Sequence, residues 1–474
     1  MSEDLTPDLC MIGAGSGGLS VAAIAASFGV PAVLVERGRM GGDCLNVGCV
    51  PSKALIAAAD CAHAMRTADR FGIGAVEPAV NMAAVRDHVR GVIAAIAPND
   101  SVERFSALGV RVIAAEARFI DPRTVVAGPH RIRARRFVLA TGSEPAAPPI
   151  PGLDGTPFLT NETVFDLAET PRHLLIVGGG PIGVELAQAH RRLGAAVTIV
   201  EAERVLPRDD PEMASVVERA LLADGVRLRA GASIRHVERR GGRIALHLDG
   251  ETVEGSHLLV AAGRRPVVKG LGLDEAGIRH DRSGIVVDKG LRTTNRRVYA
   301  IGDCAGGEAG PYKFTHVSND HAGLVIRSVL FRLPVRVRPE LVPRVTYTDP
   351  ELAAVGLGEQ EARARHRAIR ILRWPVAEND RAQAERRTEG HSKATVTARG
   401  RILGCTIAAP GAGDLIVPWV LALAKGLKVQ DLAGLVFPYP TLSEVSKRAA
   451  VEFLRPSAQN PWLRRLIGVA RRFG

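Results

Sequence analysis

The sequence predicts an α/β chain that contains two strand–helix–strand units and ends in an α+β region. Three observations lead to this prediction. An apolar strand, a glycine-rich turn, an alanine-rich helix and a second apolar strand follow one another in residues 8–38. The same order returns in residues 172–203, and from about residue 338 the pattern becomes α+β without another glycine-rich turn.

The length favours several domains, because 474 residues are too many for one ordinary core. We expect residues 1–150 and 270–337 to form the first domain and residues 151–269 the second. Residues 338–454 then form the third, and residues 455–474 a basic tail. The proline-rich stretch PAAPPIPG marks the joint between the first two domains.

The first glycine-rich turn has the spacing of a dinucleotide-binding loop. Gly13, Gly15 and Gly18 form a G-x-G-x-x-G pattern between strand and helix, and Glu36 ends the next strand. Glycine lets backbone N–H groups approach a pyrophosphate at a helix N-terminus, and the acid accepts a hydrogen bond from a ribose hydroxyl. The pattern therefore predicts a Rossmann-like dinucleotide-binding domain.

The second unit repeats this arrangement with Gly178, Gly180, Gly183 and Glu201. A carboxylate at the end of that strand binds an unphosphorylated ribose and repels a 2′-phosphate, which favours NADH over NADPH. Two such domains indicate two dinucleotides, and a flavin that accepts hydride from a nicotinamide is the simplest pair.

Two arginines qualify the preference for NADH. Arg204 and Arg208 follow the second unit directly, within reach of the ribose that Glu201 is expected to bind. Their positive charge leaves NADPH open as a second donor.

Cys44 and Cys49 follow the first unit in the segment GGDCLNVGCVPSK. On a regular α-helix, positions i and i+5 place their Cα atoms about 8 to 9 Å apart, whereas a disulfide needs less than about 7 Å. A bond between them therefore requires a distorted helix, and Gly48 and Pro51 favour such a distortion. Cys49, near a helix start and close to Lys53, is expected to be a reactive thiolate.

Composition argues against several other functions. The cysteines are too few for a disulfide framework and lack the paired spacing of a structural zinc site, so no metal site is predicted. The net charge of +12 comes from dispersed basic residues without a nucleic-acid motif, which argues against nucleic-acid binding. We find neither a signal-peptide pattern nor a long apolar run, and expect a cytoplasmic enzyme. We expect Cys10, Cys61, Cys304 and Cys405 to be inert packing residues.

These motifs resemble those of the class I pyridine nucleotide-disulfide oxidoreductases. GGDCLNVGCVPSK is accompanied, in the family's order, by GAGSGG, LATGS, GGGPIGVE, AAGRRP, YAIGDCA and YTDPELAAVG. The likeness extends to about residue 454. It implies FAD, an NAD(P)H donor, and a homodimer in which the C-terminal dimerisation domain of one subunit completes the active site of the other.

The resemblance also implies roles for single residues. Cys44 is similar to the thiol that attacks the substrate, and Cys49 to the thiolate that lies against the flavin. Lys53 and Glu185 match an ion pair beside the flavin ring, and Asp303 matches a residue that binds the ribityl chain. The same motifs add Thr141 and Gly142 at FAD and Gly263 at NAD(P).

One stretch, FPYPTLSE, departs from the family's disulfide reductases, which carry a histidine where this chain has Tyr439. Glu444 matches the glutamate that holds that histidine. A phenol with a pKa of about 10 is a poor base at neutral pH, whereas an imidazole with a pKa of about 6.5 is well matched. A tyrosine here is similar to mercuric reductases, although those enzymes carry C-terminal cysteines and this chain has none after Cys405.

Three functions therefore stay open. The first is NAD(P)H-dependent reduction of a small disulfide or thiol compound through Cys44 and Cys49. The second is reduction of mercury or another thiophilic metal ion, and the third is diaphorase-type electron transfer.

Residues 461–473, PWLRRLIGVARRF, separate into an apolar and a basic side when they are projected as a helix. The apolar side carries Trp462, Leu463, Leu466, Ile467, Ala470 and Phe473, and the other side carries Arg464, Arg465, Arg471 and Arg472. We expect the apolar side to pack on the enzyme's own core. The alternative is peripheral contact with an anionic membrane surface.

Overall fold

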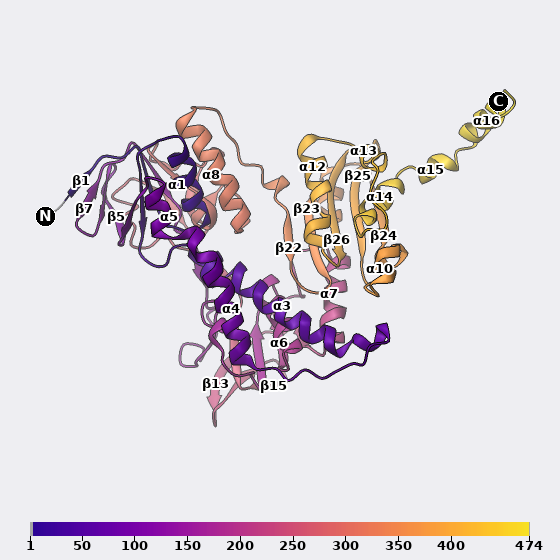
Figure 1. Cartoon of the computed structure of the whole chain (residues 1–474), viewed down its shortest axis with the longest axis horizontal. Helices are drawn as coiled ribbons and strands as arrows, with labels where there is room; N and C mark the ends of the chain where they lie inside the picture. The colour runs from indigo at the N-terminus through magenta and orange to yellow at the C-terminus, as the bar shows by residue number, and fades with distance from the viewer. Residues whose placement is uncertain (1–2, 474) are drawn as a thin grey trace.

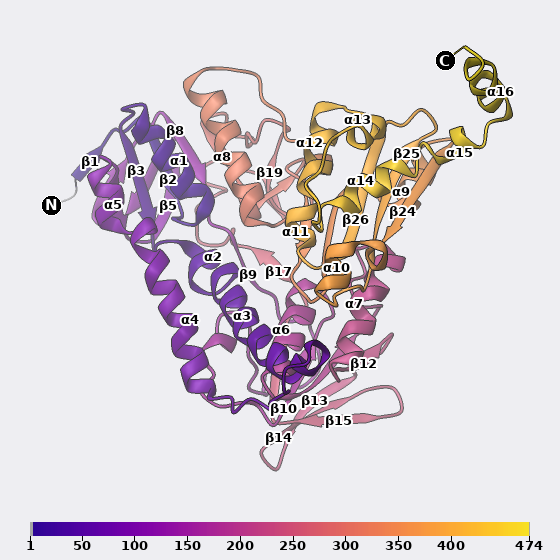
Figure 2. The same ribbon diagram turned by 45° about the vertical axis from the view of Figure 1, so that its right-hand side comes forward.

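The computed structural model describes residues 3–473 and confirms the α/β class with a C-terminal α+β part. Figure 1 shows the N-terminal elements and the C-terminal elements on opposite sides, with the second strand–helix–strand unit below and between them. Figure 2 shows the same arrangement after a turn, with the helices of the N-terminal half running down toward the second unit.

The first unit is built on a parallel sheet with the strand order β20-β8-β2-β3-β4. Helices α1 (Ser16–Ser27) and α8 (Thr315–Leu330) pack against each other beside it. Strands β2 and β20 are buried along their whole length, as is usual for parallel sheets covered on both faces. The five strands are Val298–Ala300, Arg136–Leu139, Leu9–Ile12, Ala32–Glu36 and Arg111–Ala114.

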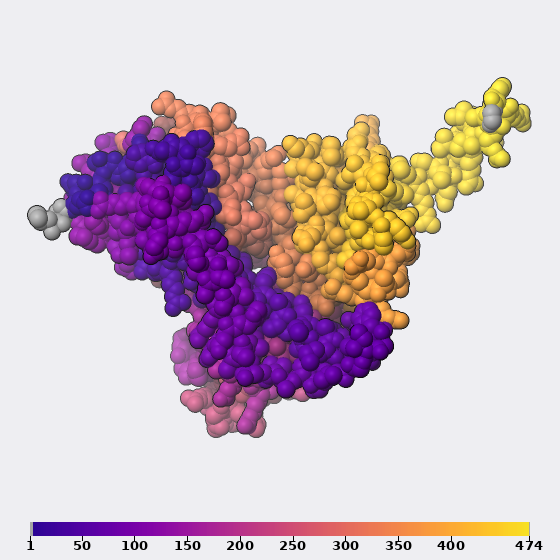
Figure 3. Space-filling model, in the orientation of Figure 1, coloured from indigo at the N-terminus to yellow at the C-terminus, as the bar shows by residue number. Residues whose placement is uncertain are grey.

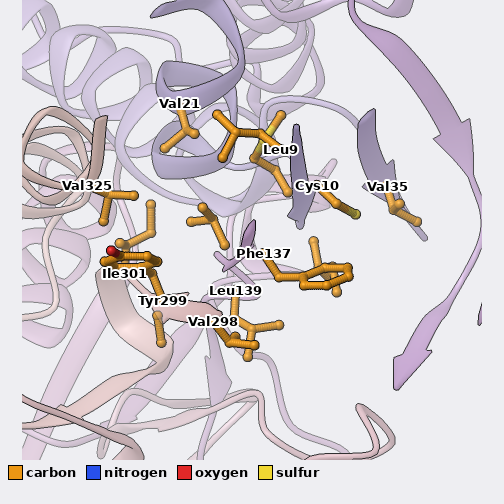
Figure 4. Packing of buried hydrophobic residues seen from close by; sticks show 14 of the residues in the cluster. Leu9, Cys10, Val21, Val35, Phe137, Leu139, Val298, Tyr299, Ile301 and Val325 are labelled. Atoms are coloured by element: carbon orange, nitrogen blue, oxygen red, sulfur yellow. The ribbon is translucent and has the colours of Figure 1, made fainter. Parts of the chain in front are cut away.

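The core of this unit joins segments that are far apart in sequence. Figure 4 shows Leu9, Phe137 and Val298, which come from three neighbouring strands. Val21 of α1 and Val325 of α8 are fully buried in the same cluster. The N-terminal segment and residues 298–330 therefore form one folded body, because neither covers its apolar surface alone.

Two small sheets flank this body. One has the order β1-β7-β6-β5 and the other the order β18-β19-β21. Their strands are Glu3–Leu5, His130–Ile132, Thr124–Ala127 and Ala117–Asp121 in the first, and His280–Asp281, Gly284–Val287 and Ala305–Gly307 in the second.

The second unit has a four-stranded parallel sheet with the order β12-β11-β10-β16. Helices α6 (Pro181–Arg192) and α7 (Pro211–Ala223) belong to it, and an antiparallel β13-β14-β15 sheet extends it. The parallel strands are Arg227–Ala230, Ala196–Glu201, His173–Val177 and His257–Val260, and the antiparallel strands are His236–Arg240, Arg243–His247 and Thr252–Gly255.

Strands β9 (Ser143–Pro145) and β17 (Arg264–Pro266) pair antiparallel and connect the chain exits of the two units. Between the first unit's β3 and β4 lie helices α2 (Gly42–Asn46), α3 (Cys49–Arg66), α4 (Met82–Ile96) and α5 (Val102–Ala107). Residues 82–107 are not one helix, because α4 ends at Ile96 and the chain forms a 3₁₀ turn at 97–100 before α5. Pro98 lies in that turn, and proline removes a helix donor.

The C-terminal part is an antiparallel sheet with the order β22-β23-β26-β25-β24. The buried Trp419 packs in its core, and its indole N–H donates to Ser446 Oγ over 3.0 Å. The strands are Arg344–Thr346, Glu351–Gly356, Ile402–Ala409, His391–Thr397 and Ile369–Pro375. The helices are α9 (Glu359–Arg365), α10 (Asp380–Ala384), α11 (Ala412–Leu415), α12 (Val417–Lys425), α13 (Val429–Ala433) and α14 (Glu444–Val451).

The tail forms two short helices, α15 (Arg455–Ala458) and α16 (Pro461–Ala470), which project from the body (Figure 3). Every residue from 454 to 473 is exposed, so the expectation that the tail packs on the core of its own chain is wrong. Within residues 3–473, no helix is long and apolar enough to cross a membrane.

Candidate active site

The first glycine turn has the backbone shape that its sequence predicts. Gly13 has φ +106°, and an added Cβ would lie 2.4 Å from the carbonyl oxygen of Ala140. A Cβ on Gly18 would lie 1.9 Å from the carbonyl oxygen of Gly13. Gly15 is the N-cap of α1 and offers no side-chain cap, so the first N–H groups of this helix are available to a pyrophosphate.

Glu36 lies beside this turn. Its carboxylate accepts hydrogen bonds from the N–H groups of Ala14 and Gly38, over 2.6 and 2.7 Å. Thr141 and Gly142 line the same cleft from the loop after β8, where Thr141 Oγ1 donates to the carbonyl of Val267 over 2.7 Å. The acid and the loop thus border the turn from opposite strands of the sheet.

The second glycine turn repeats this geometry. Gly178 has φ +109°, and an added Cβ would lie 2.6 Å from the carbonyl oxygen of Ala261. A Cβ on Gly183 would lie 2.0 Å from the carbonyl oxygen of Gly178. Gly180 is the N-cap of α6, again without a side-chain cap. Neither turn has room for a Cβ atom at its first and third glycines. Both turns therefore fit a dinucleotide, which must approach the backbone closely.

Glu201 occupies the place in the second unit that Glu36 has in the first. It accepts from the N–H groups of Gly179 and Glu203, over 2.6 and 3.0 Å. Gly263, with φ +147°, lines the cleft after β16. The guanidinium of Arg204 donates to the carbonyl oxygens of its own loop, whereas Arg208 lines the cleft.

The two predicted cysteines lie on either side of a helix break. Cys44 is inside α2, and Cys49 is the first residue of α3. Gly48 between the helices has φ −125° and ψ −113°, and an added Cβ would lie 2.9 Å from the carbonyl oxygen of Asp43. The distortion that the spacing requires is therefore present, and it sets Cys49 at a helix N-terminus.

Both cysteines are free thiols in this structure. The hydrogen bond from Cys44, together with contributions from Thr315 and the charge of Lys53, lowers the pKa of Cys49 to about 6. The same hydrogen bond raises the pKa of Cys44, and burial adds to that rise. Cys49 Sγ lies 3.5 Å from Thr315 Oγ1 of α8. At neutral pH Cys49 is therefore the thiolate and Cys44 the thiol.

Lys53 and Glu185 meet at the junction of the two units. Lys53 Nζ on α3 lies 2.8 Å from Glu185 Oε2 on α6, and the Glu185 side chain is only 8% exposed. The ammonium also lies 4.1 Å from the ring centroid of Tyr347, whose N–H donates to Glu185 Oε1 over 3.0 Å. This ion pair is thus held by both units and by the segment after β22.

Asp303 lies in the turn after β20. Its carboxylate accepts from Ser143 Oγ over 2.6 Å, and its carbonyl oxygen accepts from Lys313 Nζ over 2.7 Å. Arg264 of β17 donates to Ser143 Oγ over 2.8 Å and pairs with Asp43 of α2. The network ties the β9–β17 crossing to the helix that carries Cys44.

Tyr439 and Glu444 lie away from this cleft. The Tyr439 side chain is exposed, and its hydroxyl donates to Asp380 Oδ2 over 2.7 Å, which raises the pKa of the phenol. Glu444 begins α14 and lies 4.0 Å from Arg448. Within one chain, neither residue is brought to the cysteines.

One continuous cleft, with a volume of about 1480 Å³, joins both glycine turns to the cysteines and to the Lys53–Glu185 pair. Sequence reasoning missed Thr315 and Tyr347, which line it too. Among residues 3–473, no group of three or more His, Cys, Asp or Glu side chains has the arrangement of a metal site.

The other four cysteines and His321 lie outside the thiol pair. Cys10, Cys304 and Cys405 are buried, but Cys61 is exposed on α3, so the expectation that it packs in a core is wrong. His321 is buried and accepts from the Gly302 N–H over 3.2 Å, and burial lowers its pKa to about 4.

Comparison with known proteins identifies the fold and the family. The profile of the pyridine nucleotide-disulphide oxidoreductases matches residues 7–323, and that of the family's dimerisation domain matches residues 342–450. A mercuric reductase of Streptomyces lividans is 37% identical, over 94% of this chain and 96% of its own. Dihydrolipoyl dehydrogenase 3 of Pseudomonas aeruginosa is 36% identical, over 96% of this chain and 99% of its own.

Solved structures agree. LpdA from Mycobacterium tuberculosis superposes with a TM-score of 0.85 at 29% identity, covering 94% of this chain and 99% of LpdA. The Cu(II) complex of RclA, an HOCl-induced flavoprotein disulfide reductase from Escherichia coli, gives 0.84 at 28% identity, covering 92% and 98%. The chain belongs to the class I pyridine nucleotide-disulfide oxidoreductases and is an FAD- and NAD(P)H-dependent flavoprotein oxidoreductase.

Proposed function

We propose that this enzyme takes hydride from NADH and uses it to reduce a small disulfide through Cys44 and Cys49. The observation that carries the proposal is the position of these two thiols. They meet at the start of α3, in the cleft that also contains both glycine turns. The lowered pKa of Cys49 makes it a thiolate at neutral pH, which is the form that exchanges with sulfur.

We assign FAD to the first unit and NADH to the second. FAD would be held by the first glycine turn, Glu36, the Thr141–Gly142 loop and Asp303, and NADH by the second turn, Glu201 and Gly263. Two facts support this order: the cysteines follow the first unit directly, and Glu201 carries the negative charge that disfavours a 2′-phosphate. In domain terms, residues 1–150 and 270–337 bind FAD, and residues 151–269 bind NADH.

The bound flavin supplies two-electron exchange between the nicotinamide and sulfur. The chain's own residues then perform thiol–disulfide exchange. Cys44 attacks one sulfur of the substrate, and its proton leaves with the first thiol product. Cys49, as thiolate, attacks Cys44 Sγ and leaves the Cys44–Cys49 disulfide, and the released second thiolate takes a proton from water. Overall, NADH, a proton and one disulfide give NAD⁺ and two thiols.

Lys53 has an electrostatic part in this proposal. Its ammonium faces the cleft while Glu185, almost wholly buried, fixes its position. A cation held there stabilises negative charge on a reduced flavin, and it also favours the Cys49 thiolate. The ring of Tyr347 covers the ammonium from the other side and limits its movement.

We propose a homodimer in which Tyr439 and Glu444 face the cysteines of the partner subunit. The match of residues 342–450 to a dimerisation domain supports this assembly, as does the exposed position of Tyr439. The proposed location is the cytoplasm, where NADH is available and the remaining thiols stay reduced.

A thiophilic metal ion is the second candidate substrate, and the Tyr439–Asp380 hydrogen bond favours it. Disulfide reduction needs a base near the exchanging thiols, and a phenol whose pKa is raised by Asp380 is poorly suited to that role. Reduction of a metal ion held by two thiolates requires no such proton transfer. The similarity to mercuric reductases supports the same candidate.

Anaerobic titration of the purified enzyme with NADH tests the sulfur-based proposal. We expect two electrons to be taken up with the loss of the Cys44–Cys49 disulfide, measured by counting accessible thiols. The reduced enzyme would then be offered a small disulfide or Hg²⁺ with excess thiol. Reoxidation by one of these two compounds identifies the substrate class. NADH oxidation that depends on neither compound and persists in Cys44→Ser would support diaphorase-type electron transfer.

A further inference from the structure

The C-terminal tail, residues 455–473, is the part of the structure that the redox chemistry does not use. Its side-chain hydrogen bonds stay within or next to the tail: Arg464 Nε donates to the Ala458 carbonyl over 2.8 Å, and Asn460 caps α16 by accepting from the Trp462 N–H. The family profiles end at residue 450. Figures 1 and 3 show the tail extending into solvent beyond the C-terminal sheet.

One side of α16 exposes large apolar side chains. Trp462 is 77% exposed and Leu466 65%, and Leu463, Ile467 and Val469 are exposed beside them. At 100° per residue these positions fall within one half of the helix. Phe473, just beyond the end of the helix at Ala470, is 86% exposed. Soluble proteins rarely leave a continuous apolar face of this kind uncovered, so it is expected to have a partner.

The opposite side of the tail carries its positive charge. Arg464 and Arg465 lie there on α16, Arg471 and Arg472 continue that side just beyond the helix, and no acidic residue follows Glu452. Arg465 sits 5.9 Å from the ring of Trp462, at the border between the two sides. Large aromatic and aliphatic residues on one face and arginines on the other are typical of helices that lie in the interface of an anionic bilayer.

The stability of α16 points the same way. The helix has ten residues, all of them exposed, whereas isolated helices shorter than about 12 residues are marginal in water. Its N-cap, Asn460, favours helix formation without completing it, and no basic residue lies in its last turn. An apolar surface that buries Trp462, Leu466 and Phe473 would supply the missing stabilisation.

We propose that α16 is a peripheral membrane anchor that holds the enzyme on an anionic lipid surface. A helix of ten residues is only about 15 Å long, half the thickness of a hydrocarbon core, so it lies along the surface. Its apolar face enters the acyl boundary, and its arginines contact lipid phosphates.

Charge favours lipid over a second copy of this chain. The net charge of the chain is +12, and it stays clearly positive when the five arginines of residues 455–474 are subtracted. A second copy of this chain would therefore repel the tail overall. An anionic bilayer attracts each arginine instead.

Sedimentation of the full-length holoenzyme with vesicles tests the proposal. We expect it to sediment with phosphatidylglycerol vesicles at low salt, to remain in solution with phosphatidylcholine vesicles, and to be released by high salt. NADH oxidation, measured in the same samples, should be unchanged, so that a failure here is distinct from a failure of the proposed redox function. Equal recovery on both lipids would overturn the proposal.

Variants locate the effect. Arg465→Glu with Arg472→Glu should weaken vesicle binding by about tenfold or more, since each basic residue near the surface contributes a several-fold gain in affinity. Arg282→Glu with Arg296→Glu makes the same change of charge at exposed positions on the body and should have little effect. Trp462→Ala with Leu466→Ala should also weaken binding by about tenfold, because it removes apolar area without changing charge.

Two results would contradict a membrane anchor. Body variants that reduce binding as much as tail variants would mean that general positive charge causes it. The second result concerns a chain shortened to residue 454. If it binds vesicles like the intact chain, or differs from it only in its monomer–dimer equilibrium, the tail does not bind a lipid surface.

Discussion

The two strand–helix–strand units have the same backbone geometry at their glycine turns but contribute differently to the chemistry. In each, a glycine with positive φ meets the carbonyl oxygen of the residue that follows a neighbouring parallel strand. Measured from an added Cβ, the distance is 2.4 Å from Gly13 to Ala140, after β8, and 2.6 Å from Gly178 to Ala261, after β16. In each, a glutamate at the end of the second strand accepts two backbone N–H groups. Both can bind a dinucleotide, so the glycine turns do not decide which unit is reactive.

The difference lies in the segment that each unit carries after its second strand. After β3 the chain enters α2 and α3, whose interruption at Gly48 sets Cys49 at a helix N-terminus. After β11 it enters a loop in which Arg204 binds carbonyls of the loop itself. The second unit contributes to the cysteine site through Glu185, which holds Lys53, and through Arg264, which pairs with Asp43 of α2. A duplicated binding fold thus acquires chemistry through the segment attached to one copy.

The largest expected effect comes from removing the segment's thiols. Cys49→Ser and Cys44→Ser should each lower substrate-dependent NADH oxidation by about 10³-fold or more, because the two sulfurs act as a unit. Steady-state rates with the accepted substrate measure this. Cys61→Ser, at an exposed position on the same helix α3, is the matched control and should keep full activity. A Cys44→Ser variant of undiminished activity would place the chemistry outside the first unit's cysteines.

The second-largest loss of activity is expected at the contact between the two units, the Lys53–Glu185 ion pair. Lys53→Met should lower turnover by about 10²-fold through the loss of a positioned cation. Glu185→Gln should lower it less, because the ammonium remains but loses its anchor. If Glu185 acts through Lys53, the double variant should be no worse than Lys53→Met alone. Additive losses would show that Glu185 has a separate role, and unchanged flavin content would exclude unfolding as the cause.

The fold and the location of the site could be predicted from the sequence because they depend on local patterns. Gly13 and Gly178 need the left-handed region, and only a turn between strand and helix uses that spacing. The spacing of Cys44 and Cys49 requires a break near Gly48 if the two are to pair. Each of these inferences involves residues close together in the chain, where covalent geometry limits the outcomes.

Contacts made by distant segments could not be predicted. Thr315 is 266 positions from Cys49, and no periodicity links them. Tyr347 covers Lys53 only because β22 returns to the cleft. Asp380, at the start of α10, meets Tyr439 in the segment between α13 and α14, 59 positions away. The prediction that the tail packs on the core was wrong for a different reason. An amphipathic pattern shows that a helix has an apolar face, but it does not show what covers that face.

Matched glycine variants compare the two units directly. Gly13→Ala and Gly178→Ala each force a Cβ against a carbonyl oxygen, in a conformation that costs an L-residue about 1–2 kcal/mol. We expect Gly13→Ala to weaken flavin retention, and Gly178→Ala to raise the KM for NADH, each by about 30-fold. Flavin absorbance after gel filtration and initial-rate kinetics measure these two quantities. A loss of flavin in Gly178→Ala would reverse the assignment.

The pH dependence of Cys49 gives a smaller effect within the first unit. Because its folded pKa of about 6 lies below that of a free thiol, the thiolate is retained as the pH falls until about 6. Alkylation of Cys49 in the reduced enzyme, followed by mass spectrometry, should be half-maximal near pH 6 and level above pH 7. Cys44→Ala removes the hydrogen bond that contributes most and should move the midpoint upward. A midpoint near the pKa of an unperturbed thiol, about 8.5, would refute the thiolate assignment.

The smallest expected effect concerns the two glutamates that end the second strands. Glu201→Ser removes the carboxylate that repels a 2′-phosphate, while Arg208 stays at the cleft. The ratio of kcat/KM for NADPH to that for NADH should therefore rise by about tenfold, a change of about 1.4 kcal/mol in discrimination. Glu36→Ser makes the matched change in the first unit and should leave this ratio unaltered, because FAD carries no 2′-phosphate to admit. If Glu36→Ser altered the ratio and Glu201→Ser did not, the nicotinamide dinucleotide would bind at the first turn.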